Sequence, residues 1–307
     1  LHMYEEFDRE FLCLPVITGK KSRKETFAGA LYTMTTEALA KDGKAIQAGT
    51  SHHLGQTFSK AFGIQFQDEQ GVLQHAWQTS WGLSTRIVGT LIVCLGDDKG
   101  LRLPPAAAPI QVVFIPIWKT DEEKKKILGA LEKLAKECEK QDIRVFLDTR
   151  ENVSPGYKFN EWEVKGVPLR VEMGPRDLAD GVCTFVRRDT LEKTQIPLAK
   201  ANVKEVQKLL DAVQKDLLKD AIRFRDENIH DVNSKEEFVS LIAKDIPGFI
   251  RVYWCGDGAL EERVQEETKA TIRIIEEEAL ANEVLKGKTC FYSGKPATQR
   301  VVFAKAY

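Results

Sequence analysis

The alternation of strand and helix patterns between residues 106 and 200 most constrains the fold. Residues 110–117 are a continuous apolar run, which is typical of a strand buried on both faces. Residues 121–140 carry the apolar stripe of an amphipathic helix: Ile127, Leu128, Leu131, Leu134, Ala135 and Cys138. Further strands are predicted at 143–147, 167–173 and 182–186. This order predicts a mixed α/β domain.

Composition narrows the class of protein. The 307 residues suggest two or three domains, and 45 Lys and Arg against 46 Asp and Glu leave no overall basic field. Any nucleic-acid contact must therefore be local. The six cysteines form no CxxC pair, which favours reduced thiols and a cytoplasmic location. No run is long enough to span a membrane, and no signal peptide is recognisable.

The start of the chain has helical apolar spacing at Leu1, Tyr4, Phe7 and Phe11 but no capping residue and no initiator Met. We interpret it as the C-terminal part of something longer.

Antiparallel strands are predicted next, at 30–36 and 44–49 with a turn at 41–43, followed by a short helix at 54–62. The polar residues here are dense for a sheet, which suits a pocket for a small polar ligand. His52 and His53 are interpreted as hydrogen-bonded histidines, because no Cys or carboxylate stands beside them at metal-ligand spacing.

Residues 78–93, QTSWGLSTRIVGTLIV, combine polar residues with an apolar segment that we expect to be a buried helix. Backbone N–H groups at a helix start attract anions, Gly82 admits a flat ligand, and Arg86 can stack on a base or bind phosphate. The alternative is an ordinary capped helix in which Arg86 pairs with a carboxylate, and the residues alone favour it.

The rest of the chain completes three expected domains, 1–100, 101–200 and 201–307. Residues 96–109 are rich in Gly, Pro and Ala and indicate a linker. Residues 203–230 form a long amphipathic helix whose stripe indicates packing, and 231–307 form a small mixed domain. The fold class is α+β.

Several long motifs carry a family resemblance: ETFAGALYT, IQAGTSHHLGQTFSKAF, QTSWGLSTR, GYKFNEWEVKGVPLRVEMGPRDL and the terminal VVFAKAY. Together they resemble prolyl-tRNA synthetase of the eukaryotic and archaeal type, over essentially the whole chain. The resemblance implies part of a class II antiparallel catalytic sheet, an α/β anticodon-binding domain and a C-terminal domain. TSWGLSTR corresponds to motif 3, whereas motifs 1 and 2, including the motif 2 Arg, would precede this chain.

The resemblance also implies site residues. The expected catalytic residues are Arg86 and His52. The expected proline-binding residues are Glu25, Phe27, His52, Ser80 and Trp81. The expected ATP-binding residues are Gln47, Thr50, Ser84, Thr85 and Arg86. A carboxylate suits the imino nitrogen of proline, an aromatic wall suits its ring, and a cation suits adenine.

The expected tRNA-binding residues are Phe159, Glu163, Arg170, Arg176 and Asp177. Aromatic and charged side chains suit unstacked bases, and we expect both arginines to project from a sheet edge to read guanines. Without the resemblance, Glu163 and Arg170 would be interpreted as a surface pair of little energetic value.

The family often holds zinc with four cysteines in the last domain. Here only Cys255 and Cys290 remain, with Leu260 and Ser293 at the other two positions, so we expect no metal there. The resemblance also implies that the tail ending at Tyr307 packs near the catalytic domain.

The predicted activity is proline–tRNA ligase: activation of proline by ATP with Mg²⁺, then transfer to tRNA(Pro). The expected partners are tRNA(Pro), the missing N-terminal half and a second copy in a homodimer, with no membrane. Because motif 2 is absent, the chain is expected to need that half for activity. Two alternatives stay open: a non-catalytic tRNA-binding module derived from a synthetase, and another class II synthetase such as the threonyl or glycyl enzyme.

Overall fold

The computed structural model describes residues 1–276 and 282–307, and its residues cluster into two compact units. The first unit comprises Leu1–Glu10, Leu14–Cys94 and Ile222–Tyr307. The second comprises Phe11–Cys13 and Leu95–Ala221. The first and third expected segments thus share one unit, and the three domain boundaries given above stay a prediction.

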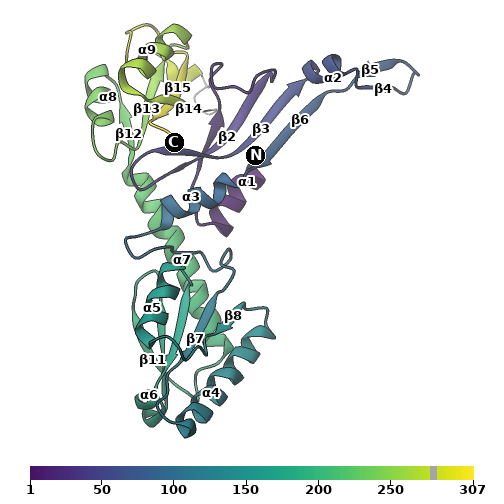
Figure 1. Cartoon of the computed structure of the whole chain (residues 1–307). Helices are drawn as coiled ribbons and strands as arrows, with labels where there is room; N and C mark the ends of the chain where they lie inside the picture. The colour runs from purple at the N-terminus through teal and green to yellow at the C-terminus, as the bar shows by residue number, and fades with distance from the viewer. Residues whose placement is uncertain (277–281) are drawn as a thin grey trace. The chain divides into compact units, whose positions relative to one another are not determined.

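An eight-stranded sheet organises the first unit, in the order β12-β13-β15-β14-β1-β2-β3-β6 (Figure 1). Strands β12 and β13 pair in parallel, and the other neighbours pair antiparallel. The strands are β1 Ile17–Lys20, β2 Tyr32–Leu39, β3 Ala45–Gly55, β6 Gln78–Leu83, β12 Ile229–Val232, β13 Phe249–Trp254, β14 Thr271–Ile275 and β15 Gln299–Ala304. The β1–β14 pair joins strands from the two ends of the chain into one sheet.

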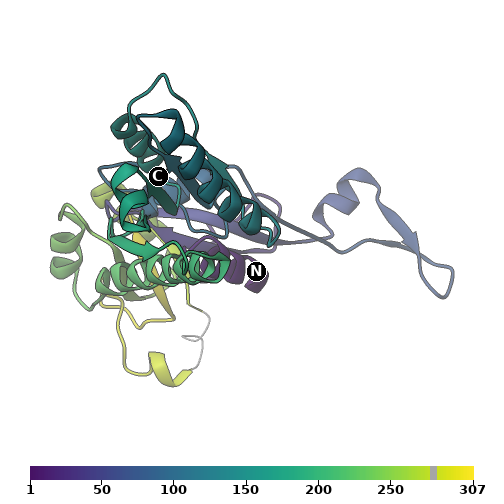
Figure 2. The same ribbon diagram turned by 90° about the horizontal axis from the view of Figure 1, so that it is seen from below.

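Helices and a small hairpin surround this sheet. They are α1 His2–Glu6, η1 Phe7–Phe11 (a π-helix), α2 Thr57–Phe62, α3 Arg86–Leu95, α8 Lys235–Ile242, α9 Gly258–Thr268, α10 Asn282–Leu285, and the hairpin of β4 Gln65–Gln67 with β5 Leu73–His75. In both views α2 and the hairpin extend beyond the ends of β3 and β6 (Figures 1 and 2). Phe62 and Leu73 in this extension are exposed.

Apolar clusters pack against this sheet. One cluster gathers around Trp254, Phe291 and Phe303, whose rings lie within 5.7–5.9 Å of one another. Another joins Leu39 and Ala45 of the expected catalytic segment to residues such as Phe249 of the expected C-terminal domain. Because apolar burial is the main driving force for association, these two segments stabilise each other.

A five-stranded sheet, ordered β11-β10-β9-β7-β8, organises the second unit. Its elements are β7 Val112–Pro116, α4 Asp121–Glu139, β8 Val145–Leu147, α5 Pro155–Val164, β9 Leu169–Met173, α6 Pro175–Asp180, β10 Val182–Arg187 and β11 Lys193–Pro197, and α7 Val203–Glu227 begins in this unit. These bounds confirm the predicted strands, the helix at 121–140 and the long helix at 203–230.

Strand β7 shows why its sequence is apolar without alternation. Val112 and Phe114 belong to the cluster under α4, whereas Val113 and Ile115 pack with Trp162 of α5. Both faces are therefore buried, as the continuous run predicted.

The motif stretch 78–93 folds differently from our prediction. Residues 78–83 do not open a helix but form strand β6, and the helix α3 begins at Arg86. Nor is α3 fully buried, because Leu91 is 7% exposed whereas Val88 is 62% exposed. Among the described residues, no helix combines the length and hydrophobicity that crossing a bilayer requires.

Candidate functional site

Strand β3 presents three predicted site residues on one face of the large sheet. His52 pairs with Thr33 of β2, Thr50 pairs with Thr35, and Gln47 pairs with Glu37. The register skips one residue of β3 between Thr50 and Gln47, and this β-bulge keeps Gln47 on the face of Thr50 and His52. Without the bulge, alternation would turn Gln47 to the other face.

Strand β6 extends this face. Ser80 pairs with His52, and Gly82 pairs with Thr50. Gly82 has no atom within 4 Å of where a Cβ would stand, so the space over the backbone is open. The face bearing Gln47, Thr50, His52 and Ser80 is called the site face below.

Phe27 reaches the site face from the loop between β1 and β2. Its ring lies 4.9 Å from the His52 ring, centroid to centroid, while 50% of Phe27 stays exposed. The Thr33 hydroxyl links both residues, because it accepts from the Phe27 N–H at 3.2 Å and lies 2.8 Å from His52 Nδ1. Burial lowers the pKa of His52, so the imidazole is neutral at neutral pH. Thr33 is the last residue of the ETFAGALYT motif, but no site role was predicted for it.

Trp81 does not join this set. It pairs with Ser51 across the β3–β6 ladder, so its side chain lies on the face opposite His52 and Ser80. Its predicted contact with proline has no support from the strand register. Glu25 is half-buried in the same loop as Phe27, and its backbone N–H donates to Ser22 Oγ at 3.3 Å.

Arg86 stands exposed at the start of α3. Ser84 Oγ accepts from the Arg86 N–H at 3.3 Å, and Thr85 lies exposed between them. Within residues 1–276 and 282–307 no carboxylate forms an ion pair with Arg86, so the structure lacks the carboxylate partner of the alternative interpretation. An exposed guanidinium beside an open strand can meet a planar or anionic ligand.

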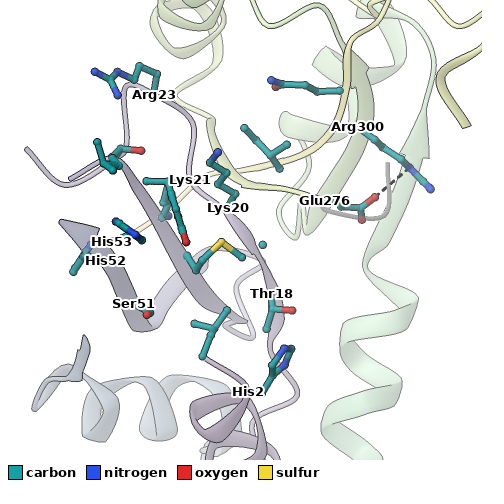
Figure 3. A pocket seen from close by; sticks show the side chains of 18 of the residues that line it. His2, Thr18, Lys20, Lys21, Arg23, Ser51, His52, His53, Glu276 and Arg300 are labelled. Atoms are coloured by element: carbon teal, nitrogen blue, oxygen red, sulfur yellow. Dashed lines mark ion pairs between the residues drawn. The ribbon is translucent and has the colours of Figure 1, made fainter. Parts of the chain in front are cut away.

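A cavity of about 1090 Å³ lies against the opposite face of the sheet (Figure 3). Among its lining residues are Lys20, Tyr32, Ser51 and His53, and of the predicted site residues only His52 borders it. The sequence analysis did not identify this cavity, because its walls come from both ends of the chain.

Helix α5 and strand β9 bring three predicted tRNA-binding residues together. The Arg170 guanidinium lies 4.8 Å from the Phe159 ring centroid and 3.7 Å from the Glu163 carboxylate. Its shortest partner is Glu172, at 2.7 Å, which the sequence analysis missed. Strand β9 is the middle strand of five, so the expectation that Arg170 projects from a sheet edge is wrong. Only 8% of Arg170 is exposed.

Arg176 and Asp177 lie at the start of α6 and differ in their surroundings. Asp177 accepts from the Gly174 N–H at 2.8 Å and from the Thr184 hydroxyl at 3.1 Å, so both oxygens have a structural partner. Arg176 is exposed, and none of the described carboxylates forms an ion pair with it. Of these two residues, Arg176 is the one whose side chain is available to a base.

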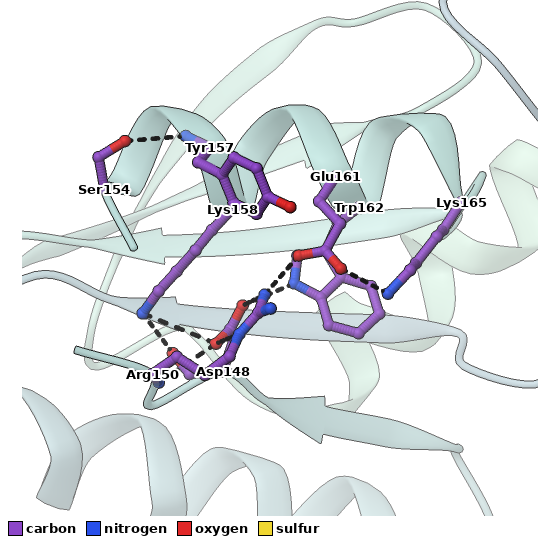
Figure 4. A network of polar contacts seen from close by, with 8 residues as sticks. All are labelled: Asp148, Arg150, Ser154, Tyr157, Lys158, Glu161, Trp162 and Lys165. Atoms are coloured by element: carbon purple, nitrogen blue, oxygen red, sulfur yellow. Dashed lines mark hydrogen bonds and ion pairs between the residues drawn. The ribbon is translucent and has the colours of Figure 1, made fainter. Parts of the chain in front are cut away.

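A buried carboxylate holds α5 in place (Figure 4). Asp148 accepts from Trp162 Nε1 at 2.8 Å and from Arg150 at 2.7 Å, and its backbone carbonyl accepts from Lys158 Nζ at 2.9 Å. Burial would raise the pKa of Asp148, but the donors, Arg150 first, hold it well below its ordinary value. The network therefore fixes the helix that carries Phe159 and Glu163.

The last domain brings the expected zinc positions together. Cys255 Sγ lies 3.7 Å from Ser293 Oγ, and Leu260 packs against the cluster that contains Cys290. No group of three His, Cys, Asp or Glu suited to a metal occurs among the described residues. The absence of zinc from this domain stays a prediction.

The fold and these faces can be compared with known proteins. Residues 111–209 match the family model described as anticodon binding domain, and residues 235–307 match the model described as prolyl-tRNA synthetase, C-terminal. Both descriptions are those of aminoacyl-tRNA synthetase domains, the class of protein that this chain resembles.

Curated relatives that match the whole chain are proline–tRNA ligases. The chain is 47% identical over 310 residues to a curated proline–tRNA ligase of Chlorobium phaeovibrioides, covering 100% of the chain and 63% of the relative. It is 46% identical over 307 residues to that of Flavobacterium johnsoniae, covering 100% and 61%. The chain is thus similar to curated proline–tRNA ligases along its whole length, the match to the prolyl-tRNA synthetase C-terminal model fits their C-terminal portion, and the chain spans somewhat less than two thirds of their length. These relatives are bacterial, and the eukaryotic or archaeal type stays a prediction.

Proposed function

We propose that this chain carries the motif 3 face, the anticodon reader and the C-terminal domain of an enzyme that activates proline and attaches it to tRNA(Pro). The single observation that supports this best is the strand register that gathers Gln47, Thr50, His52 and Ser80 on one face, with Phe27 against His52. These residues come from three separate motifs, and only folding brings them together.

Each residue has a task in the first half-reaction. The proline carboxylate attacks the α-phosphate of ATP, which forms prolyl-adenylate and releases pyrophosphate. Phe27 and the neutral His52 form a wall for the pyrrolidine ring, and Glu25 meets the cationic imino nitrogen. Such an attack needs positioning and charge stabilisation rather than a general base.

The nucleotide lies toward the other end of the site face. Gln47 and Thr50 offer polar groups, Ser84 and Thr85 offer hydroxyls, and Arg86 stacks on adenine and meets the phosphates. The expected Mg²⁺ would neutralise phosphate charge, but the described residues offer no cluster of three His, Cys, Asp or Glu for it, so no step here depends on it.

The second half-reaction needs recognition of the tRNA. Arg176, exposed at α6, is the residue we assign to a guanine of the anticodon, because a guanidinium fork matches the two acceptors on that base. Phe159 and Arg170 form a stacked pair that can support an unstacked base. The cytoplasmic location and the homodimer belong to this proposal as well.

Two matched arginine variants of the full-length enzyme test the proposal. Arg86→Ala should strongly reduce proline-dependent ATP–pyrophosphate exchange while leaving tRNA affinity near wild type. Arg176→Ala should weaken tRNA(Pro) binding while retaining exchange, which needs no tRNA. Binding of tRNA without any exchange in the wild-type enzyme would contradict the catalytic role and favour the non-catalytic alternative.

A further inference from the structure

The loop between β1 and β2 carries two of the predicted proline contacts, Glu25 and Phe27, yet much of it is exposed. Its start is different: Lys21 is 3% exposed and Ser22 is 4% exposed. In a loop whose first residues are buried and whose tip is exposed, the contacts of the buried residues fix the backbone geometry.

Ser22 is held by the C-terminal domain. Its hydroxyl donates to Glu261 Oε1 of α9 at 2.6 Å, and Glu261 is itself only 6% exposed. The same Ser22 oxygen accepts from the Glu25 N–H at 3.3 Å, and the Ser22 carbonyl accepts from Thr26 Oγ1 at 2.8 Å. A short chain of hydrogen bonds therefore runs from α9 to the backbone of Glu25.

A second link fixes the other end of the loop. The Phe27 N–H donates to Thr33 Oγ1, which also contacts His52 on the site face. The backbone of Glu25 is thus tied to the C-terminal domain, and the backbone of Phe27 is tied to the sheet. The Glu261 link is the only one of the two that comes from outside the expected catalytic segment.

Burying a carboxylate costs free energy, because the charged group loses its hydration. Burial raises the pKa of Glu261, the hydrogen bond from Ser22 opposes this, and an apolar side chain at this position would avoid the desolvation cost. A polar group that is retained at such a position can specify one geometry over others.

We propose that Glu261 is a positioning residue for the proline site, acting through Ser22 to set the loop that carries Glu25 and Phe27. This inference rests on the proposed function, and it gives the C-terminal domain a role in amino-acid binding rather than in tRNA binding or folding alone.

The test compares Glu261→Ala, Glu261→Gln and the matched control Glu262→Ala. Glu262 is the next residue of α9, its side chain is 64% exposed, and among the described residues it forms one ion pair, with Lys24 at 3.8 Å. Glu261→Gln keeps an oxygen that can accept from Ser22. Hydrogen exchange of residues 22–30 is measured in the 307-residue chain, and KM for proline and for ATP are measured in the full-length enzyme.

Glu261→Ala should speed hydrogen exchange of the Glu25 amide and raise KM for proline about 10-fold, less than the roughly 100-fold that a 1 Å misplacement can cost, because Phe27 keeps its link to Thr33. KM for ATP should stay near wild type. Glu261→Gln should recover most of the loss, and Glu262→Ala should match wild type.

Several results would overturn the inference. Unchanged hydrogen exchange in residues 22–30 would show that Glu261 does not hold the loop. Faster hydrogen exchange with an unchanged KM for proline would show that the loop does not set the geometry of the proline site. A parallel rise of both KM values would indicate a general fold defect. If Glu261→Ala does not fold, Ser22→Ala removes both the bond to Glu261 and the acceptor of the Glu25 N–H, so this variant is judged only by KM for proline against KM for ATP. If the wild-type enzyme does not activate proline, the proposed function is wrong. The hydrogen-exchange measurement still decides whether Glu261 holds the loop.

Discussion

Arg273 and Glu37 lie 236 positions apart in the sequence and form a buried ion pair at 2.9 Å. Arg273 belongs to β14 and Glu37 to β2, and the other Glu37 oxygen accepts from Lys21 at 2.6 Å. The three charges thus join the expected C-terminal and catalytic segments inside one sheet. Sequence patterns give no sign of this pair, because each residue alone is typical of an exposed position.

Breaking this trio should destabilise the first unit strongly. Arg273→Met leaves the fully buried Glu37 with one cation instead of two, and removing one partner of a buried pair costs about 3–5 kcal/mol. Chemical denaturation of the 307-residue chain measures the effect. The control is Lys295→Met, whose side chain is 62% exposed and pairs with Asp257 at the surface, and it should change little. Equal effects of the two variants would show that the trio contributes no more than a surface pair.

Asp8 should make the chain less stable as the pH rises. One Asp8 oxygen accepts from Thr36 Oγ1 at 3.1 Å, while the other is buried without a hydrogen-bond partner among the described residues. Burial raises the pKa of Asp8 to about 6, above its value of 3.8 in the unfolded chain. The folded state then binds the extra proton, so stability is full below about pH 4 and falls toward pH 6.

Asp8→Asn removes the titrating carboxyl group, so this variant is the control with which the wild type is compared at each pH. The free energy of unfolding of the wild type minus that of the variant should decrease between pH 4 and pH 6 and then level off. A difference that does not vary with pH would contradict a raised pKa for Asp8.

Alanine variants of Arg170 and Arg176 should distinguish a structural role from a role in tRNA recognition. Arg170→Ala removes the partner of Glu172 and Glu163 and should lower the melting temperature. Arg176→Ala should leave the melting temperature unchanged and cost about 1–3 kcal/mol of tRNA binding, with relaxed specificity at one base. Binding to tRNA(Pro) and to transcripts with each anticodon guanine changed is measured at two salt concentrations. Equal losses for Arg176→Ala on all transcripts would show a phosphate contact instead of a base contact.

The C-terminal domain should contain no stoichiometric zinc. Its two cysteines stand with Leu260 and Ser293 where a four-ligand site would need thiolates, and two ligands do not make a structural zinc site. Elemental analysis of the purified protein is the measurement. One zinc per chain that survives dialysis against EDTA would contradict this expectation.

Local patterns predicted β7, β8, β9, β10, α4 and α7 of the second unit, because these elements follow simple rules of apolar spacing, whereas α5, α6 and β11 were not predicted. Strand β7 is buried on both faces and is apolar throughout, and α4 places Leu131 and its neighbours on one stripe. The same reasoning was wrong for residues 78–83, where the polar residues belong to a strand rather than to a helix start.

The remaining features of the site depend on the pairing of strands that are far apart in the sequence. The bulge that turns Gln47 to the site face depends on the register with β2, and Trp81 falls on the opposite face because of the register with β3. Arg170 lies on a central strand because β10 and β7 flank β9. None of these partners can be identified from the residues adjacent in sequence.

Amino-acid-dependent ATP–pyrophosphate exchange tests the central claim most directly. The full-length enzyme should exchange with proline and not with threonine or glycine, because Phe27, His52 and Glu25 suit a cationic pyrrolidine ring. The 307-residue chain alone should show no exchange, because the motif 2 Arg and its strands are missing from it. Exchange driven by threonine or glycine, or robust proline-dependent exchange by the 307-residue chain alone, would contradict the account.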